Sequence, residues 1–196
     1  MAERKAVVTR ETAETNVRVE LNVDGGGQFK ITTGVRMFDH LLTQLAQHGV
    51  FDIRLSASGA DQHHVVEDVA ISLGKAFNQA LGEKRGITRM AHAIVPMDEA
   101  LAVVAVDVGG RTYSVIEASF TKANIGDLNA DLVRHFLVSF ASEAKINLYA
   151  KVLTGINDHH EAEALFKALA RALDAATRID ERIVGRIPST KEIIEN

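Results

Sequence analysis

The chain of 196 residues contains no cysteine. Disulfide bonds, thiolate nucleophiles and metal sites built on sulfur are therefore excluded. Any metal ion that the protein binds must be held by histidine, aspartate and glutamate side chains, which offer nitrogen and oxygen donors.

The sequence also lacks the marks of a secreted or membrane protein. Its N-terminal segment, MAERKAVVTRE, has no apolar region typical of a signal peptide, and no apolar run approaches the ~20 residues of a membrane span. The composition is that of a globular protein, with 46% hydrophobic and 24% charged residues. We therefore expect a soluble, cytoplasmic protein.

Positive charge is not in excess either. The formal net charge is −4, and no run of basic residues stands out along the chain. Because nucleic acids and anionic membranes are bound largely through clustered lysine and arginine, we expect neither as a partner.

The sequence does contain an internal repeat, shared by the two halves of the chain. Each half has a strand, a Gly-rich turn and a second strand, at 21–31 (LNVDGGGQFKI) and at 104–114 (VAVDVGGRTYS). This pattern predicts a β-hairpin. A helix, a strand, a short loop and a second helix follow each hairpin, over 37–81 and over 132–173.

Apolar residues recur with the periods that these elements require. Those at 38–45 follow the helical period, and those at 51–55 alternate as in a half-buried strand. A further strand-like run precedes each predicted hairpin, at 5–12 and at 88–97. Each half is therefore predicted to contain, in order, three strands, a helix, a fourth strand and a second helix.

This order of elements predicts an internally duplicated α+β fold. Each half should form a four-stranded mixed sheet with two helices on one face, and the helices would be half exposed if the half stood alone. The two halves should therefore pack helix layer to helix layer, between the two sheets. The expected boundaries are 1–84 for the first half, 85–176 for the second half and 177–196 for a C-terminal tail.

Three histidines and one glutamate recur at matched places in the two halves. The two sets are His40, His63, His64 and Glu67, and His135, His159, His160 and Glu163. A single histidine near a helix start is more often a cap, a surface residue or a buried structural group than a ligand. Recurrence in two otherwise diverged copies favours metal binding, since packing alone would accept leucine or alanine. Mixed nitrogen and oxygen donors suit Mn(II), Fe(II) or Zn(II).

Helix geometry predicts two ions rather than one. His63 and Glu67 lie four residues apart and share a helix face, whereas His64 points about 100° around the axis and must reach another ion. The same division applies to His159 with Glu163 against His160. Eight ligands shared by two ions give three imidazoles and one carboxylate each, but the residues do not indicate which ion His40 and His135 bind.

Five motifs resemble those of the imidazoleglycerol-phosphate dehydratase family of histidine biosynthesis: FDHLLTQLAQHG, HHVVED, PMDE, NDHHEAEALFKALARAL and PSTK. The resemblance extends from 10–15 (RETAET) to 188–191 (PSTK). It implies a hydro-lyase that removes water from D-erythro-imidazole glycerol phosphate and forms imidazole acetol phosphate. It also implies two Mn(II) ions per active site and a homo-oligomer, a 24-subunit shell with sites shared between neighbouring subunits. Since no phosphatase domain accompanies these motifs, we expect a monofunctional protein.

The resemblance also implies roles for individual residues. The catalytic set would be Glu14, as the acid–base residue, with the eight metal ligands named above. The substrate-binding set would be Glu14, His40, His48, His63, Glu67, Arg89, Arg111, His159, Lys167, Ser189, Thr190 and Lys191. Of these, Arg89, Arg111, Ser189 and Lys191 would hold the substrate phosphate, so that the C-terminal tail contributes to the active site. Taken singly, each of these cations would be interpreted as a solvated surface charge.

Other interpretations stay open at this stage. Asp98 and Glu99 in PMDE would either hold the metal ligands in position without binding the metal, or simply form a turn between strands. His92 is expected to be structural. The same metal ligands and cations would also suit a dinuclear metallohydrolase acting on a phosphate ester. A non-enzymatic shell whose subunits are joined by metal ions is the third alternative.

Overall fold

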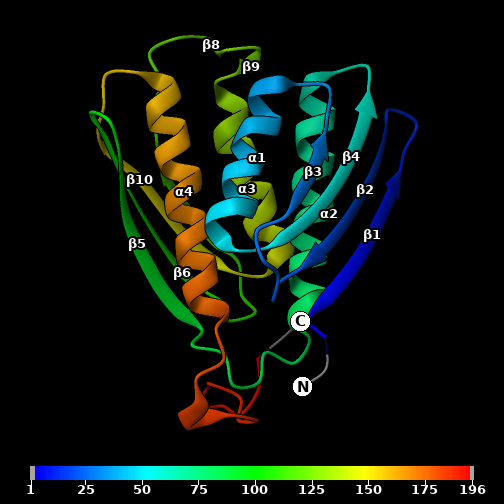
Figure 1. Cartoon of the computed structure of the whole chain (residues 1–196), viewed down its shortest axis with the longest axis vertical. Coiled ribbons are helices and arrows are strands. Elements are labelled where there is room, and N and C mark those ends of the chain that lie inside the picture. Colours follow the sequence, from blue (N-terminus) through cyan, green and yellow to red (C-terminus); the bar gives the residue numbers. More distant parts are fainter. Residues whose placement is uncertain (1–2, 195–196) are drawn as a thin grey trace.

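Two four-stranded sheets enclose four helices in the computed structural model, which describes residues 3–194 (Figure 1). The first half contains β1 (Lys5–Glu11), β2 (Thr15–Asn22), β3 (Phe29–Thr32), α1 (Arg36–Gly49), β4 (Asp52–Gly59) and α2 (Gln62–Leu81). The second half contains β5 (Met90–Met97), β6 (Ala100–Asp107), β7 (Tyr113–Glu117), α3 (Asp131–Ala144), β10 (Asn147–Thr154) and α4 (Asp158–Thr177). A short pair, β8 (Asn124–Ile125) and β9 (Leu128–Asn129), precedes α3, and one 3-10 turn (Glu181–Ile183) follows α4.

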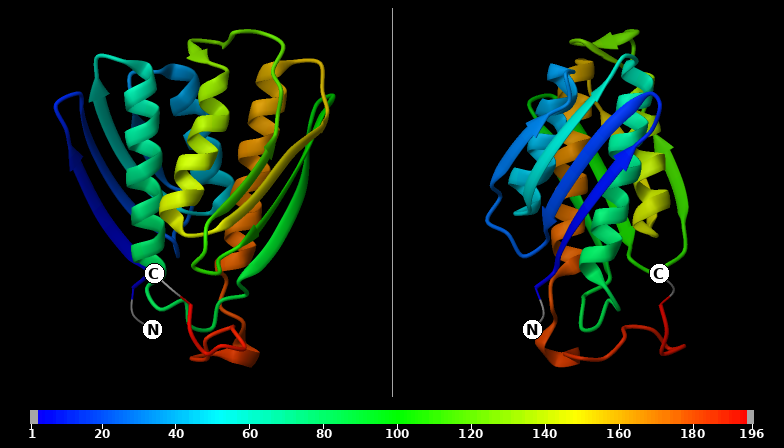
Figure 2. Two further views of the ribbon diagram at one scale, coloured as in Figure 1. Left: turned by 180° about the vertical axis from the view of Figure 1, so that it is seen from behind. Right: turned by 90° about the vertical axis from the view of Figure 1, so that its right-hand side faces the viewer.

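The two sheets have the same topology. Their strand orders are β1-β2-β4-β3 and β5-β6-β10-β7, which place corresponding strands of the two halves in corresponding positions. In each sheet three strands are antiparallel and the last strand joins in parallel. The helices lie between the sheets, as the left view of Figure 2 shows. The predicted duplicated α+β fold is confirmed.

The predicted hairpins at the Gly-rich turns are wrong. β4 lies between β2 and β3, and β10 lies between β6 and β7, so the strands that flank each turn are not paired. The loop after β2 instead crosses the start of β4. There the Asp52 carboxylate accepts hydrogen bonds from the backbone N–H groups of Gly26 (2.8 Å) and Gln28 (3.0 Å). A side chain at Gly25 would collide with Asp52. Glycine is therefore required here because the loop passes close to β4, and not because the chain forms a tight turn.

The helices form the core by packing their apolar faces against one another. The rings of Phe38 and Phe136 meet edge to face at 5.4 Å, and Phe136 stacks on Phe140 and Phe166. Gly74 allows α2 to approach α3 closely, because a Cβ atom there would lie 2.7 Å from the carbonyl oxygen of Phe140. Within residues 3–194, no helix combines the length and the apolar composition that a membrane crossing requires.

All four helices begin at the same end of the molecule, opposite the C-terminal tail (Figure 1). The N-cap of α2 is Asp61, whose carboxylate accepts a hydrogen bond from the backbone N–H of His63 (2.6 Å). The N-cap of α4 is Asn157, which accepts from the N–H of His159 (2.9 Å). These caps place both histidine pairs in a first helical turn, where the partial positive charge of the helix also favours nearby carboxylates.

Candidate metal centre

Two clusters of imidazole and carboxylate groups lie at the end of the molecule where the helices begin. The first cluster is His40, His159 and Glu163, and the second is His63, Glu67 and His135. In each cluster, one potential ligand atom of every residue lies within 4.8 Å of the others. Both clusters draw on the two halves of the chain: His40 of α1 meets α4, and His135 of α3 meets α2. The structure therefore places His40 with His159 and Glu163, and His135 with His63 and Glu67.

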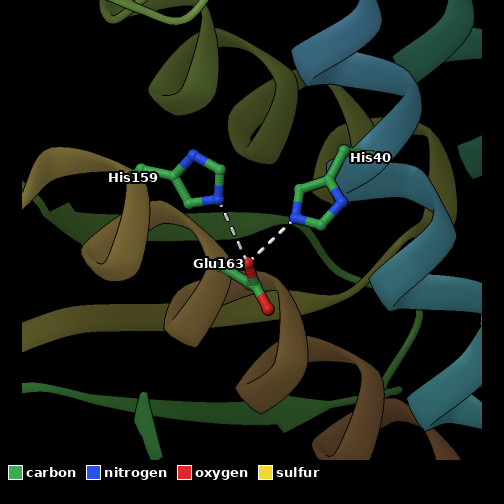
Figure 3. A group of neighbouring side chains, drawn as sticks. All are labelled: His40, His159 and Glu163. Atoms are coloured by element: carbon green, nitrogen blue, oxygen red, sulfur yellow. Dashed lines mark hydrogen bonds and ion pairs between the residues drawn. The ribbon is translucent and has the colours of Figure 1, made fainter. Parts of the chain in front are cut away.

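The first cluster converges on a single carboxylate oxygen (Figure 3). Glu163 Oε2 lies 2.9 Å from His40 Nε2 and 3.3 Å from His159 Nε2. The other oxygen, Oε1, lies 2.6 Å from Lys167 Nζ, one turn further along α4. Burial by itself would raise the pKa of Glu163, but the hydrogen bonds from Lys167 and His40 outweigh it and lower the pKa to about 2. Glu163 is therefore held as a carboxylate.

The second cluster is more open. His135 Nε2 lies 3.5 Å from Glu67 Oε1, and the rings of His63 and His135 are 4.6 Å apart. The His135 Nε2 atom is buried, yet among residues 3–194 it has no hydrogen-bond partner. A buried polar atom without a hydrogen bond lowers the stability of the fold unless another group or an ion binds it. It borders a cavity of about 760 Å³ that is also lined by His63 and Arg134.

The second histidine of each pair lies outside both clusters. His64 Nδ1 is 3.5 Å from Glu14 Oε2, and His160 Nδ1 is 2.8 Å from Glu99 Oε2. The divergence of adjacent histidines follows from the helix geometry, because neighbouring residues point in different directions. One chain therefore brings six of the eight expected ligands together in two clusters of three.

The residues expected to hold a phosphate lie at the opposite end of the molecule. Arg89 Nε and Nη2 donate to the two oxygens of Asp107 (2.7 and 3.0 Å), and Arg89 Nη1 donates to the carbonyl of Pro188 (2.8 Å). Ser189 and Lys191 follow in the tail, where Ser189 Oγ accepts from the backbone N–H of Lys191 (3.2 Å). Arg111, in the loop after β6, and Thr190 are exposed. The structure does not bring these residues and the metal clusters together within one chain.

His48 and Lys167 lie on the facing helices α1 and α4. His48 bonds Gln44 one turn earlier (Nε2 to Oε1, 3.1 Å), and burial together with the charge of Lys167 lowers its pKa. Lys167 also donates to Met97 Sδ (3.4 Å). His92 lies on β5, away from both clusters, beside a shallow cavity on the outer face of the second sheet.

Asp68 is a buried charge that the sequence reasoning did not single out. It accepts hydrogen bonds from Arg10 (Nε to Oδ1, 2.7 Å) and from the hydroxyl of Thr15, and so fastens the β1–β2 hairpin to α2. The sequence does contain an indication of this role. Asp68 lies near Val65 and Val69 on the apolar face of a predicted helix, where a carboxylate without a partner would be unfavourable. Its neighbour in sequence is Glu67, so the network adjoins the second cluster.

Comparison with known proteins decides the family. Residues 33–173 match the family model for imidazoleglycerol-phosphate dehydratase. The chain belongs to the imidazoleglycerol-phosphate dehydratase family. The imidazoleglycerol-phosphate dehydratase of Dehalococcoides mccartyi strain 195 is 58% identical to this chain, and the match covers 100% of both chains. That of Chloroflexus aurantiacus is 54% identical, and the match covers 97% of this chain and 95% of the relative. The family resemblance of the motifs is thereby confirmed, and with it a hydro-lyase of histidine biosynthesis.

Solved structures of the family share the fold. A crystal structure of imidazoleglycerol-phosphate dehydratase from Staphylococcus aureus subsp. aureus N315 superposes with a TM-score of 0.80 at 31% identity, covering 89% of this chain and 99% of that chain. The enzyme from Pyrococcus furiosus, solved in complex with (S)-C348, gives a TM-score of 0.83 at 34% identity, covering 95% and 100%. The duplicated architecture is thus that of the family.

Proposed function

We propose that the chain removes water from imidazole glycerol phosphate, forming imidazole acetol phosphate, with two divalent cations per active site and Mn(II) as the native metal. The observation that carries this proposal is the pair of clusters, each with two imidazoles and one carboxylate, at the start of the helices. Nitrogen and oxygen donors without sulfur suit Mn(II). The buried Nε2 of His135, which has no hydrogen-bond partner among residues 3–194, supports the same proposal, because a bound cation would satisfy it.

Each cation would be held by one cluster and completed by a further ligand. Bound divalent cations would supply Lewis acid chemistry to the imidazole ring of the substrate and orient it. The remaining ligands would be His64 and His160, which lie outside the clusters of their own chain. We propose that they reach the clusters of neighbouring subunits, so that each ion gains three imidazoles and one carboxylate.

The distance between the two ends of the chain also supports a site shared between subunits. The expected phosphate ligands lie beyond the C-terminal ends of the helices, whereas the metal clusters lie at their N-terminal ends (Figure 1). A helix of 20 residues, such as α4, spans about 30 Å. One small substrate does not bridge that distance. The proposal therefore includes a homo-oligomer, of which the 24-subunit shell implied by the sequence is the specific form.

Glu14 is the proposed acid–base residue. Its side chain is 61% exposed in the β1–β2 turn and lies beside His64 at the metal end of the molecule. Its backbone N–H donates to Thr12 Oγ1 (3.2 Å), which holds the turn while leaving the carboxylate free to approach a substrate. Glu14 would take the C2 proton of the substrate, and such positioned proton transfer typically contributes about 10²–10⁴-fold to the rate.

The far end of the substrate would be held by Arg89, Arg111, Ser189, Thr190 and Lys191. Asp107 fixes the guanidinium of Arg89 with two hydrogen bonds, so the group is oriented before a ligand arrives. Guanidinium and ammonium groups complement a phosphate dianion, and its binding energy would orient the reacting carbons. His48 and Lys167 are proposed as further substrate contacts.

Incubation of the purified protein with Mn(II) and imidazole glycerol phosphate tests the function. The proposal requires formation of the ketone product without release of inorganic phosphate. Release of phosphate would indicate a metallohydrolase instead. Neither product, together with loss of assembly on chelation, would indicate a shell joined by metal ions.

A further inference from the structure

Glu99 is the counterpart of Glu14 in the duplicated fold. Glu14 immediately precedes β2, and Glu99 immediately precedes β6, the strand in the corresponding position of the second sheet. His64 and His160 are likewise counterparts, each being the second histidine of its pair. The contacts Glu14–His64 and Glu99–His160 therefore occur at equivalent places in the two halves.

The two glutamates are held in different ways. Glu14 approaches His64 Nδ1 only to 3.5 Å, and its side chain is 61% exposed. Glu99 Oε2 lies 2.8 Å from His160 Nδ1, while Oε1 accepts hydrogen bonds from the backbone N–H groups of Asn157 (2.9 Å) and Ile156 (3.3 Å). Both oxygens of Glu99 are thus held by hydrogen bonds, whereas Glu14 meets its histidine only at 3.5 Å.

The paired helices also differ at the residue that follows the clustered glutamate. In the first half, Asp68 of α2 fastens the β1–β2 hairpin by accepting from Arg10 and Thr15. The corresponding residue of α4, directly after Glu163, is Ala164, which has no polar group to do this. In the second half, Glu99 in the β5–β6 turn contacts residues at the start of α4, namely Ile156, Asn157 and His160.

The contact with Glu99 determines which nitrogen of His160 is available. An imidazole that donates its Nδ1 hydrogen to a carboxylate presents an unprotonated Nε2 and has a fixed ring orientation. Asp98 Oδ2 lies 3.6 Å from His160 Nε2, within ion-pair distance but too far to form a hydrogen bond with that nitrogen.

We infer that Glu99 is a positioning residue that orients His160 to bind a divalent cation through Nε2, while its counterpart Glu14 is left free for proton transfer. The inference rests on the proposed function, in which His160 is a metal ligand. Duplication would thus have supplied the same glutamate twice, and the two copies serve different purposes.

Equilibrium binding of Mn(II) to the intact metal-free protein, measured from the free Mn(II) signal in electron paramagnetic resonance, tests the inference. The variants are Glu99→Gln, His160→Ala and the double variant, with Glu14→Gln as the matched control. A glutamine offers its one amide oxygen either to the backbone N–H groups or to the imidazole, but not to both. Glu99→Gln should weaken one of two bound ions by about 10- to 100-fold, and Glu14→Gln should bind both ions as the parent chain does.

The double variant separates positioning from a general structural effect. If Glu99 acts through His160, the double variant binds Mn(II) no more weakly than His160→Ala alone. Unchanged binding by Glu99→Gln, or equal additional weakening in the double variant, would overturn the inference. If Glu99→Gln does not fold, Glu99→Asp provides the same comparison, since its shorter side chain keeps the charge near the backbone but withdraws it from the ring. A parent chain that binds no Mn(II) would instead contradict the proposed function.

Discussion

Lys167 Nζ lies 2.6 Å from Glu163 Oε1, one turn beyond the carboxylate that His40 and His159 approach. The corresponding position of α2 is Ile71, so α2 has no lysine one turn beyond Glu67. The two clusters are therefore equivalent in the duplicated fold but differ chemically. They should also be separable by mutation.

The crossed pairing predicts which substitutions remove the same ion. Glu163→Gln and His40→Ala should each reduce the Mn(II) content from two ions per chain to one by removing the first ion. His135→Ala should remove the other ion, because His135 belongs to the cluster on α2. The double variant Glu163→Gln/His40→Ala should retain one ion, whereas Glu163→Gln/His135→Ala should retain none. Elemental analysis after equilibrium dialysis measures these counts, and one ion retained in both double variants would refute the pairing.

Glu14→Gln should retain metal and substrate binding but lose turnover. The amide keeps the shape of the side chain yet does not accept the substrate proton, so kcat should fall by about 10²–10⁴-fold. Substrate affinity should change little, since the phosphate ligands lie on other elements. Steady-state kinetics and substrate titration separate the two quantities. A near-normal kcat would contradict the assigned role.

Arg89→Gln should weaken substrate binding rather than metal binding. Loss of a charge-assisted contact to phosphate costs about 1.5–3 kcal/mol, which corresponds to a rise of roughly 10- to 100-fold in the substrate Kd. The control is Arg186→Gln, which removes an exposed cation from the same end of the molecule. Isothermal titration with substrate at saturating Mn(II) provides the comparison. Equal effects of the two substitutions would mean that only general charge matters at this end.

Asp52→Ala should destabilise the fold in a manner that depends on pH. The backbone N–H groups of Gly26 and Gln28 lower the pKa of Asp52 below its usual 3.8. A carboxyl whose pKa is lowered on folding stabilises the protein above the unfolded value, and this contribution is lost as the pH falls through the folded pKa.

At pH 7 the free energy of unfolding should therefore decrease by about 2 kcal/mol in Asp52→Ala, and the difference from the parent chain should shrink below pH 3.8. Urea denaturation at fixed protein concentration measures it. Glu20→Ala, which removes a half-exposed carboxylate of β2 paired with Arg18, is the control and should cost less than about 0.5 kcal/mol. A deficit that is constant across this pH range would show that the loop is not held by the charge of Asp52.

Local sequence patterns predicted the elements and the two-copy architecture, because amphipathic periods report which face of each helix and strand is buried. They did not predict the strand order. The segment LNVDGGGQFKI predicts a hairpin, but its two strands are separated in the sheet by β4, which comes later in the chain. The two-residue strands β8 and β9 are too short to carry any period.

The candidate ligands were identified from their recurrence, whereas their grouping depends on tertiary packing. Which of α2 and α4 meets His40 is set by how the helices of the two halves pack together, and no spacing within one helix encodes this. The role of Glu99 is a similar case. A turn motif does not distinguish an exposed acid from one that faces a histidine, and only the three hydrogen bonds of Glu99 do so.

Anomalous diffraction from crystals of the Mn(II)-loaded protein, recorded on both sides of the manganese absorption edge, tests the central claim most directly. The account predicts two peaks per chain, one among His40, His159 and Glu163 and the other among His63, Glu67 and His135, each completed by a histidine of a neighbouring subunit. Peaks elsewhere, or a single peak shared by both clusters, would contradict it.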